Sequence, residues 1–266
     1  MILFIFEGSN PDTDIYNSME YVFFGQKDTS QRIVSCYNGN IYDLYSKVVE
    51  NGGDMDLIAL LRERYDDLTK CPITNDMKRS DFAEVYLFFD YDFHHNADIT
   101  SVEELNKQVQ EMLCLFDNET ENGKLYISYP MVEAIKYTKQ LPDNNYHTYT
   151  TSRKECVHFK QNADNFSHTK YKNNRFIITH NKDTDKHKDE VRKNWQLINE
   201  QNLTKAHWLC NDTLSLPDRY DEEFQQKIFQ AQLKKYVIPS ECVSILSAYP
   251  LFLFDYFGRV ILSPAQ

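Results

Sequence analysis

Two kinds of hydrophobic pattern alternate along the first half of the chain. Short runs that are apolar throughout, such as residues 2–6 and 85–89, are typical of strands buried on both faces. Runs with apolar residues three or four positions apart, as at 41–49 and 56–65, predict amphipathic helices. This alternation predicts an α/β fold, a parallel sheet flanked by helices.

The predicted elements can be placed along the chain. We expect strands at 2–6, 33–36, 85–89 and 125–128, and helices at 15–24, 41–49, 56–65, 102–116 and 130–139. Ser101 and Glu104 have the spacing of a capping box before the fourth helix. Pro130 suits the first turn of the fifth.

The amino-acid composition of the sequence changes after Pro142. Residues 143–194 are polar and rich in Asn, Lys, His and Tyr, and only 175–179 resemble a strand. From 221 onward the pattern is helical, and the chain ends in a segment that predicts a buried helix bent at Pro250. We therefore predict two domains, 1–142 and 143–266, the second mainly helical.

Acidic residues stand where the predicted strands end. Glu7 follows the first strand, Asp90 and Asp92 close the third, and Glu133 follows the fourth. The carboxyl ends of parallel strands meet at one edge of a sheet, so these side chains can share a divalent ion. Oxygen ligands without cysteine favour Mg²⁺ or Mn²⁺ over Zn²⁺. The alternative is that they are ordinary loop or cap residues.

Two further residues near these carboxylates have candidate chemistry. His94 directly follows the Asp pair, as does His95, and an imidazole can position a water or donate a proton to a phosphate. Either can equally be a surface histidine without a role in catalysis. Glu133 in the first turn of a helix would be favoured by the helix dipole with or without a metal.

Charge is unevenly distributed along the chain, whose net charge is -11. Residues 1–150 carry 26 acidic and 12 basic side chains, whereas residues 151–195, here named the basic segment, carry 11 basic and 6 acidic ones. We predict nucleic-acid contacts from its Arg153, Lys154, Lys160, Lys170, Lys172, Arg175, Arg192 and Lys193. The aromatic residues among them would stack on unpaired bases: Phe159, Phe166, Tyr171, Phe176 and Trp195. The alternative is an exposed helical hairpin with no partner.

Composition narrows the class of protein. With 41% hydrophobic residues the chain can form a packed core, and no apolar run approaches the length of a membrane span. The six cysteines stand singly, without a CxxC pair, which argues against a zinc ribbon and a disulfide framework. The first strand is not preceded by basic residues and makes a poor signal peptide. We expect a cytoplasmic protein with reduced thiols and no membrane contact.

Two motifs resemble those of the Toprim fold. The stretch FIFEGSNPD is similar to its first motif, a strand ending in Glu-Gly with an Asp four residues later, here Asp12, and LFFDYDFHH is similar to its Asp-x-Asp motif. The likeness covers about residues 1–140. It implies a Toprim-like catalytic domain in which Glu7, Asp90 and Asp92 bind Mg²⁺ or Mn²⁺ and support phosphodiester cleavage, with Glu133 and His94 as further catalytic candidates.

A third stretch, SYPMVEAIKY, resembles a Ser-x-Pro-x-x-Glu motif of bacterial phage-defence and abortive-infection nucleases of the overcoming-lysogenization-defect kind. It points to Ser128, Pro130 and Glu133. The resemblance implies an antiviral endonuclease effector acting on RNA, including tRNA, or on DNA, with a partner ATPase of the ABC or SMC type; a homodimer is left open. The long spacing between Glu7 and Asp90 implies inserted helices, and a topoisomerase tyrosine motif is not recognisable.

Two other functions fit part of the pattern. A glycosyl- or nucleotidyltransferase also uses Asp-x-Asp after a strand to bind Mn²⁺ and a nucleotide diphosphate, but it has no place for the early Glu-Gly. A non-catalytic subunit of an ATPase would keep the fold without metal-dependent cleavage.

Overall fold

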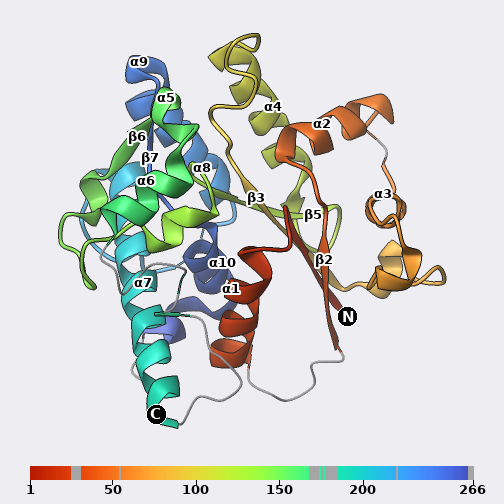
Figure 1. The fold of residues 1–266 in the computed structure, drawn as a ribbon, viewed down its shortest axis with the longest axis horizontal. Coiled ribbons are helices and arrows are strands. Elements are labelled where there is room, and N and C mark those ends of the chain that lie inside the picture. Colours follow the sequence, from red (N-terminus) through yellow and green to blue (C-terminus); the bar gives the residue numbers. More distant parts are fainter. Residues whose placement is uncertain are drawn as a thin grey trace.

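A five-stranded sheet forms the centre of the protein (Figure 1). The computed structural model describes residues 1–24, 31–53, 55–167, 174, 176–177, 185–219 and 221–262. The strands of the sheet are β1 (Ile2–Phe6), β2 (Arg32–Cys36), β3 (Glu84–Asp90), β4 (Asp117–Asn118) and β5 (Gly123–Ser128), in the order β2-β1-β3-β5-β4. All neighbours are parallel except β4, which runs antiparallel to β5. The predicted α/β class and its four parallel strands are confirmed.

The connections place a topological switch between β1 and β3. From β1 the chain moves to β2 on one side, then returns across β1 to β3 on the other and continues outward to β5. Neighbouring strands whose connections leave in opposite directions open a crevice at their carboxyl ends, where ligands of α/β proteins usually bind. Glu7 and Asp90 stand at this position.

Helices account for most of the remaining structure. The first half contains α1 (Asp12–Met19), which continues into a π-helical turn at Glu20–Phe24, α2 (Ile41–Glu50), α3 (Leu57–Glu63) and α4 (Val102–Leu115). The second half contains α5 (Arg153–Cys156), α6 (Phe159–Phe166), α7 (Asp185–Asn211), α8 (Phe224–Gln232), α9 (Ile238–Ser240) and α10 (Ala248–Phe257). Short 3-10 segments occur at Leu68–Lys70, Arg79–Asp81, Val132–Lys136, Tyr146–Thr148 and Gly258–Leu262, and a π-helical turn at Leu233–Val237. A small antiparallel pair joins β6 (Thr150–Ser152) to β7 (Cys242–Ser244). Not one of the helices in the described ranges is long and apolar enough to cross a membrane.

Local sequence accounts for where several helices begin. Asn40, Asp56 and Ser101 each accept backbone N–H groups from the first turn of α2, α3 and α4. Such caps satisfy donors that have no partner inside the helix. The predicted helices at 41–49, 56–65 and 102–116 are thus confirmed to within a few residues.

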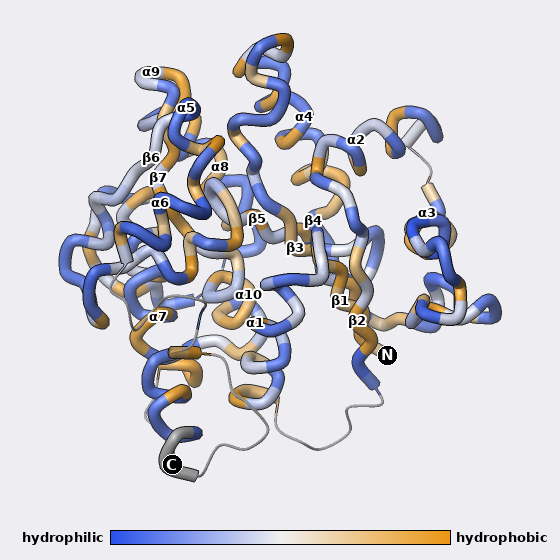
Figure 2. Tube along the Cα trace, in the orientation of Figure 1, coloured by the Kyte–Doolittle hydropathy of each residue, from blue (hydrophilic) through white to orange (hydrophobic). Residues whose placement is uncertain are grey.

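The two faces of the sheet are chemically different. Phe4, Phe6, Tyr86, Phe88 and Tyr126 share one face and contact aromatic rings of α1 and α10, including Tyr16 and Phe252. Alternation along the strands places the aliphatic residues on the other face, toward α2 and α4 (Figure 1). Figure 2 shows the resulting hydrophobic centre with polar outer helices.

One hydrophobic cluster extends across position 142. It includes Leu3 of β1 and Ile261 near the end of the chain, and Phe252 of α10 lies against Phe4, Tyr86 and Tyr126 of the sheet. A division into domains 1–142 and 143–266 remains a prediction, but residues on both sides of it belong to the same core.

Several expectations about single elements are wrong. Pro130 does not begin a helix to 139, because the segment forms only the short 3-10 turn Val132–Lys136. Glu133 therefore has no long helix whose dipole could favour its charge. Pro250 does not bend a helix, since α10 begins at Ala248 and the proline lies in its first turn, where no intrahelical N–H bond is lost.

Two other expectations concern the ends of segments. The predicted first helix begins at Asp12, earlier than expected, and changes to π-helical geometry at Glu20. The strand predicted at 175–179 is wrong at Phe176 and Ile177, which form a turn. The other three residues of that stretch lie outside the described residues.

Candidate functional site

Glu7 lies at the carboxyl end of β1, next to the end of β3. Its Oε2 accepts a hydrogen bond from the backbone N–H of Asp90 at 2.9 Å, and its own N–H donates to the carbonyl of Phe88 at 3.0 Å. The side chain is thus directed across the gap between the two strands. A Cβ added at the following Gly8 would meet no atom within 4 Å, so open space adjoins Glu7.

Asp90 and Asp92 lie on either side of the point where β3 ends. Asp90 is paired with Ser128 in the sheet and is only 9% exposed. Asp92 adopts φ 44°, and its N–H donates to the carbonyl of Pro130 at 3.0 Å. A positive φ is uncommon for residues other than glycine but is tolerated by Asp. This conformation turns the chain out of the sheet directly after the Asp pair.

A fourth carboxylate comes from the start of α1. Asp12 is buried and accepts a hydrogen bond from the Tyr249 hydroxyl of α10 at 2.7 Å. Tyr249 in turn stacks on Phe6 and Phe88 of the sheet. The C-terminal part of the chain thereby holds Asp12 at the edge where Glu7 and Asp90 lie.

A fifth carboxylate follows β5. Glu133 is 3% exposed, and its Oε1 is 3.9 Å from the ammonium nitrogen of Lys160 on α6. Its Oε2 is buried and has no hydrogen-bond partner within the part of the chain that the structure describes. A buried carboxylate oxygen without a partner is costly unless a cation or a ligand satisfies it.

These carboxylates raise one another's proton affinity. Burial, followed by the negative charge of Asp92, raises the pKa of Glu7 to about 9. Burial also raises the pKa of Asp12 to about 6. The pKa of Asp90 is raised by burial and by the charges of Glu7, Asp12, Asp92 and Glu133, in that order. Burial raises the pKa of Asp92 as well, with His94 and His95 opposing it.

Together these side chains form an acidic cluster, here named the carboxylate cluster: Glu7, Asp12, Asp90, Asp92 and Glu133. Its members are oxygen donors from four chain segments, a donor set that suits Mg²⁺ or Mn²⁺. As the side chains stand, no three His, Cys, Asp or Glu residues within the described ranges already surround one point as metal ligands do. Binding an ion therefore requires some of these side chains to rotate.

Two histidines flank the carboxylate cluster. His94 is half-buried, and its Nδ1 is buried without a hydrogen-bond partner among the described residues. His95 stacks on Tyr42 of α2 with ring centroids 4.6 Å apart. Burial lowers the pKa of His95, and the charge of Asp92 opposes the shift. The predicted position of His94 beside the acidic residues thus holds, and its catalytic role stays a prediction.

The basic segment is less uniform than its sequence indicates. Arg153 is anchored: its guanidinium donates to the carbonyls of Phe93 and Thr100 at 3.0 and 2.9 Å. Lys154 and Lys160 are exposed, and Lys160 is the one that approaches the carboxylate cluster. On α7, Lys193 is exposed and Arg192 is half-buried. Lys170, Lys172 and Arg175 lie outside the described residues.

The predicted stacking role of the aromatic residues in the basic segment is wrong for three of them. Phe159, Phe176 and Trp195 are buried, and the Trp195 indole N–H donates to Ser18 Oγ at 3.0 Å. Phe166 is half-buried and stacks on Tyr137 with centroids 4.1 Å apart. Phe159, Phe176 and Trp195 are therefore core residues, which their alternation with charged residues in the sequence does not indicate. Tyr171 lies outside the described residues.

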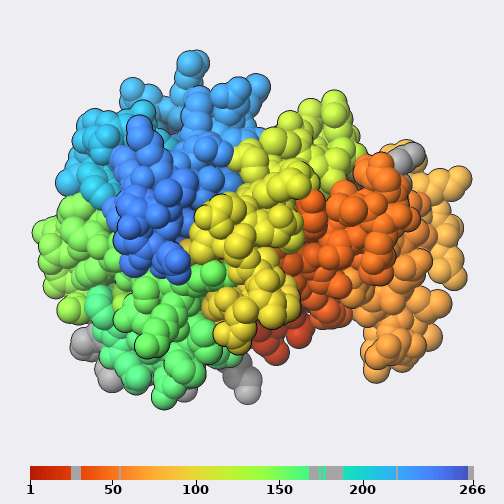
Figure 3. All heavy atoms as spheres, turned by 90° about the horizontal axis from the view of Figure 1, so that it is seen from above, coloured from red at the N-terminus to blue at the C-terminus, as the bar shows by residue number. Residues whose placement is uncertain are grey.

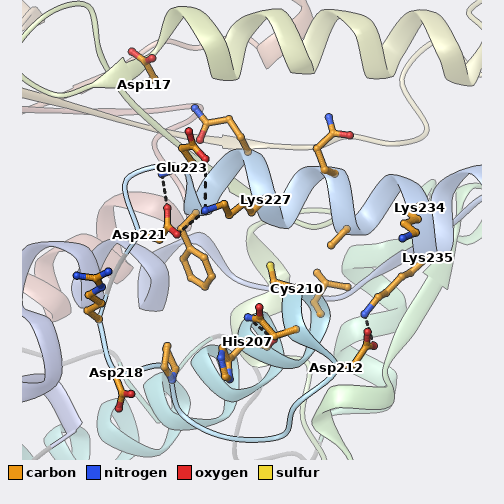
Figure 4. Close-up of a pocket in the computed structure, with 18 residues that line it drawn as sticks. Asp117, His207, Cys210, Asp212, Asp218, Asp221, Glu223, Lys227, Lys234 and Lys235 are labelled. Carbon is orange, nitrogen blue, oxygen red and sulfur yellow. Dashed lines mark hydrogen bonds and ion pairs between the residues drawn. The ribbon is translucent and has the colours of Figure 1, made fainter.

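A wide cavity lies away from the carboxylate cluster (Figure 4). It measures about 930 Å³ and lies between the end of α7, the loop after it and α8. Several of its charged side chains are paired: Lys227 with Asp221 and Glu223, and Lys235 with Asp212.

Some members of this site are predictable from the sequence and others are not. Glu7, Asp90, Asp92 and Glu133 follow predicted strands, whereas Asp12 occurs only within a motif. Tyr249 was missed because no local pattern connects it to Asp12, 237 residues away. The specific pairing of Lys160 with Glu133 was also missed, although the lysine belonged to the predicted basic set.

Comparison with known proteins adds no identification. No protein-family model, no curated protein and no solved structure matches the chain. The class defined by the fold and site is an α/β protein with buried carboxylates at the switch point of a mostly parallel sheet.

Proposed function

We propose that this protein is a metal-dependent phosphodiesterase that cleaves nucleic acid. The observation that supports it most is the carboxylate cluster itself: five acidic side chains, three of them almost fully buried, without a buried cation among the described residues to neutralise them. Such an arrangement is unfavourable in the bare protein and becomes favourable with divalent cations. Its position at the topological switch supports a site for a ligand.

Glu7, Asp90 and Asp92 would hold Mg²⁺ or Mn²⁺, with the free Oε2 of Glu133 as a further ligand. Divalent ions in such a site orient an attacking water and stabilise the leaving oxygen of a phosphodiester. Asp12, held by Tyr249, would keep the local charge negative enough to retain the ions.

Two groups next to the carboxylate cluster would act on the substrate. The ammonium group of Lys160 lies on the rim of the site and would attract a phosphate. The Nδ1 of His94, buried beside Asp92, would hold or move a proton at the reacting phosphate.

The proposed family of the nuclease and its proposed partner depend on the sequence motifs alone. We propose a Toprim-like nuclease of the phage-defence kind that acts on RNA or DNA together with an ABC- or SMC-type ATPase. A transferase that binds a nucleotide diphosphate would use Asp90 and Asp92 but would leave Glu7 without a role, which is why we favour the nuclease.

The test is a cleavage assay on total RNA and plasmid DNA with Mg²⁺ or Mn²⁺, with and without the products of neighbouring genes. We expect wild-type protein to cut and Asp90→Asn to lose at least 100-fold of that activity, since a missing metal ligand removes several kcal/mol of transition-state stabilisation. Asp117→Asn, an exposed aspartate on β4, is the matched control and should cut normally.

Thermal melts distinguish loss of metal from loss of fold. The Asp90→Asn protein should melt at or above the wild-type temperature without metal, because one source of repulsion is removed. It should also lose the stabilisation that Mn²⁺ confers on the wild type. Full activity and a full Mn²⁺ shift in this variant would refute the proposal, and an intact protein that never cuts would favour a non-catalytic subunit.

A further inference from the structure

A small polar pocket lies beside the carboxylate cluster. It measures about 330 Å³, at the small end of the range for ligand sites, and lies between the start of α2, the loop after β3 and α4. Its polar lining includes three carboxamides, Asn40, Asn96 and Gln108, together with the ring of His95. Figure 3 shows the loop after β3, in yellow, at the centre of one face beside orange residues of the segment that contains α2.

The ring of His95 is held in one orientation. One face of the ring lies on Tyr42 with an interplanar angle of 18°, which leaves only the opposite face for a planar ligand. Its backbone N–H donates to the carbonyl of Asp92 at 2.7 Å. Tyr42 is fixed as well, because its hydroxyl donates to the carbonyl of Tyr91 at 2.6 Å.

The hydrogen-bonding pattern also selects one tautomer of His95. Asn40 Oδ1 caps α2 by accepting from the N–H groups of Tyr42 and Asp43, so its Nδ2 must face His95 Nδ1, 3.3 Å away. Nδ1 is then an acceptor, and the hydrogen of a neutral imidazole is on Nε2. The Asn96 carboxamide lies 2.9 Å from Nε2 and accepts that hydrogen when its oxygen is turned toward the ring.

The pocket adjoins the loop that carries the Asp pair. Two of its lining residues bond that loop: the His95 N–H donates to the carbonyl of Asp92, and the Tyr42 hydroxyl donates to the carbonyl of Tyr91. The part of a ligand that extends out of this pocket would therefore lie near Asp90 and Asp92. Groups of this kind, a fixed planar ring with carboxamides around it, recognise the face and the edge of a nucleobase.

We propose that this pocket binds one unpaired nucleobase of the substrate, next to the phosphate that is cleaved. The inference rests on the proposed function and adds a source of sequence preference to it. The base would stack on the free face of His95 while Asn96 and Gln108 form hydrogen bonds with its edge. A single-stranded or locally unpaired segment is required, because a paired base cannot enter a pocket of this size.

The first experiment measures base preference at the cut site. Wild-type protein cleaves a single-stranded RNA or DNA oligonucleotide with randomised positions, and the cut ends are sequenced. We expect a bias at one position next to the cut, reduced about tenfold in Asn96→Gly and in Gln108→Ala, as for one lost base-edge interaction. Glycine keeps the positive φ of Asn96, and Gln110→Ala, on the same helix outside the pocket, is the matched control that retains the bias.

A second experiment does not depend on cleavage. The side-chain amide and imidazole resonances of ¹⁵N-labelled protein are followed while AMP, GMP, CMP or UMP is added. We expect shifts at Asn40, Asn96 and Gln108 that Gln110→Ala preserves and Asn96→Gly reduces. Shifts without cleavage would uphold the pocket while the proposed function fails.

Two results would overturn the inference. Cleavage without a base preference, or with a preference that Asn96→Gly and Gln108→Ala leave intact, would refute base binding by this pocket. The proposed function would still be supported. Absence of both cleavage and nucleotide-induced shifts would remove both.

Discussion

At the scale of single residues, the fold raises the proton affinity of Glu7. Its pKa rises from 4.5 to about 9 because of burial and the charge of Asp92. Between these two values the folded state keeps a proton that the unfolded state has lost. The contribution of Glu7 to the free energy of unfolding is therefore fully present below about pH 4.5 and decreases as the pH rises toward 9.

We predict that metal-free protein melts at a progressively lower temperature from pH 5 to pH 9, by several degrees in total. Glu7→Gln should flatten this dependence, because a neutral amide keeps the acceptor for the Asp90 N–H without titrating. The measurement is a series of melts in a chelator. Glu63→Gln, an exposed residue of α3, should follow the wild type, and a Glu7→Gln curve parallel to the wild type would contradict the assignment.

A second residue, Lys160, connects the basic segment to the carboxylate cluster. Its side chain is 71% exposed, so its pairing with Glu133 contributes little to stability. We predict that Lys160→Ala weakens nucleic-acid binding and lowers the slope of log affinity against log salt by about one unit. Anisotropy titrations at several salt concentrations test it. Lys70→Ala, another exposed and paired lysine, is the control, and an unchanged slope in Lys160→Ala would exclude a phosphate contact.

At the scale of elements, the loop after β3 depends on α5 for its shape. Arg153 donates to two carbonyls of this loop, and its guanidinium lies over the Phe93 ring at 5.6 Å. Removing it leaves those carbonyls without their charged donor.

We predict that Arg153→Ala lowers the free energy of unfolding by about 1.5–3 kcal/mol, the usual range for hydrogen bonds to a charged group. Lys154→Ala, one residue away and exposed, should change it by less than about 0.5 kcal/mol. Urea unfolding of both variants shows whether Arg153 stabilises the loop after β3 or is only a charge on the surface. Equal stability in the two variants would show that Arg153 does not support the loop.

At the scale of the whole molecule, α10 joins the end of the chain to the central sheet. Phe252 is fully buried and contacts rings of three strands. Since one core extends across position 142, the two halves of the chain should unfold together.

We predict that Phe252→Ala lowers the free energy of unfolding by about 3–5 kcal/mol, as for other buried aromatic residues cut to alanine. Both tryptophans, Trp195 and Trp208, follow position 142, and a dye on the exposed Cys114 reports on the first half. The two probes should show a single coincident transition in wild type and variant. Separate transitions would instead support two independent domains divided near 142.

The local pattern of the sequence was sufficient to predict most elements of the sheet and its helices. Apolar runs, period-3.6 patterns and helix caps act over a few residues, which is why Ser101 marks the start of α4 in the sequence. The same local signals failed for 130–139, where only a short 3-10 turn forms, and at Pro250, which lies in the first turn of α10.

What the sequence by itself determined is the set of carboxylates at strand ends, because parallel strands must present their carboxyl ends at one edge. Only the tertiary structure decided which other groups join them. Tyr249 reaches Asp12 across 237 residues, and Lys160 reaches Glu133 through the docking of α6. It also decided that Trp195 and Phe159 are core residues rather than nucleic-acid contacts. Whether a distant segment buries a residue depends on how whole elements pack, and a local sequence pattern does not determine that packing.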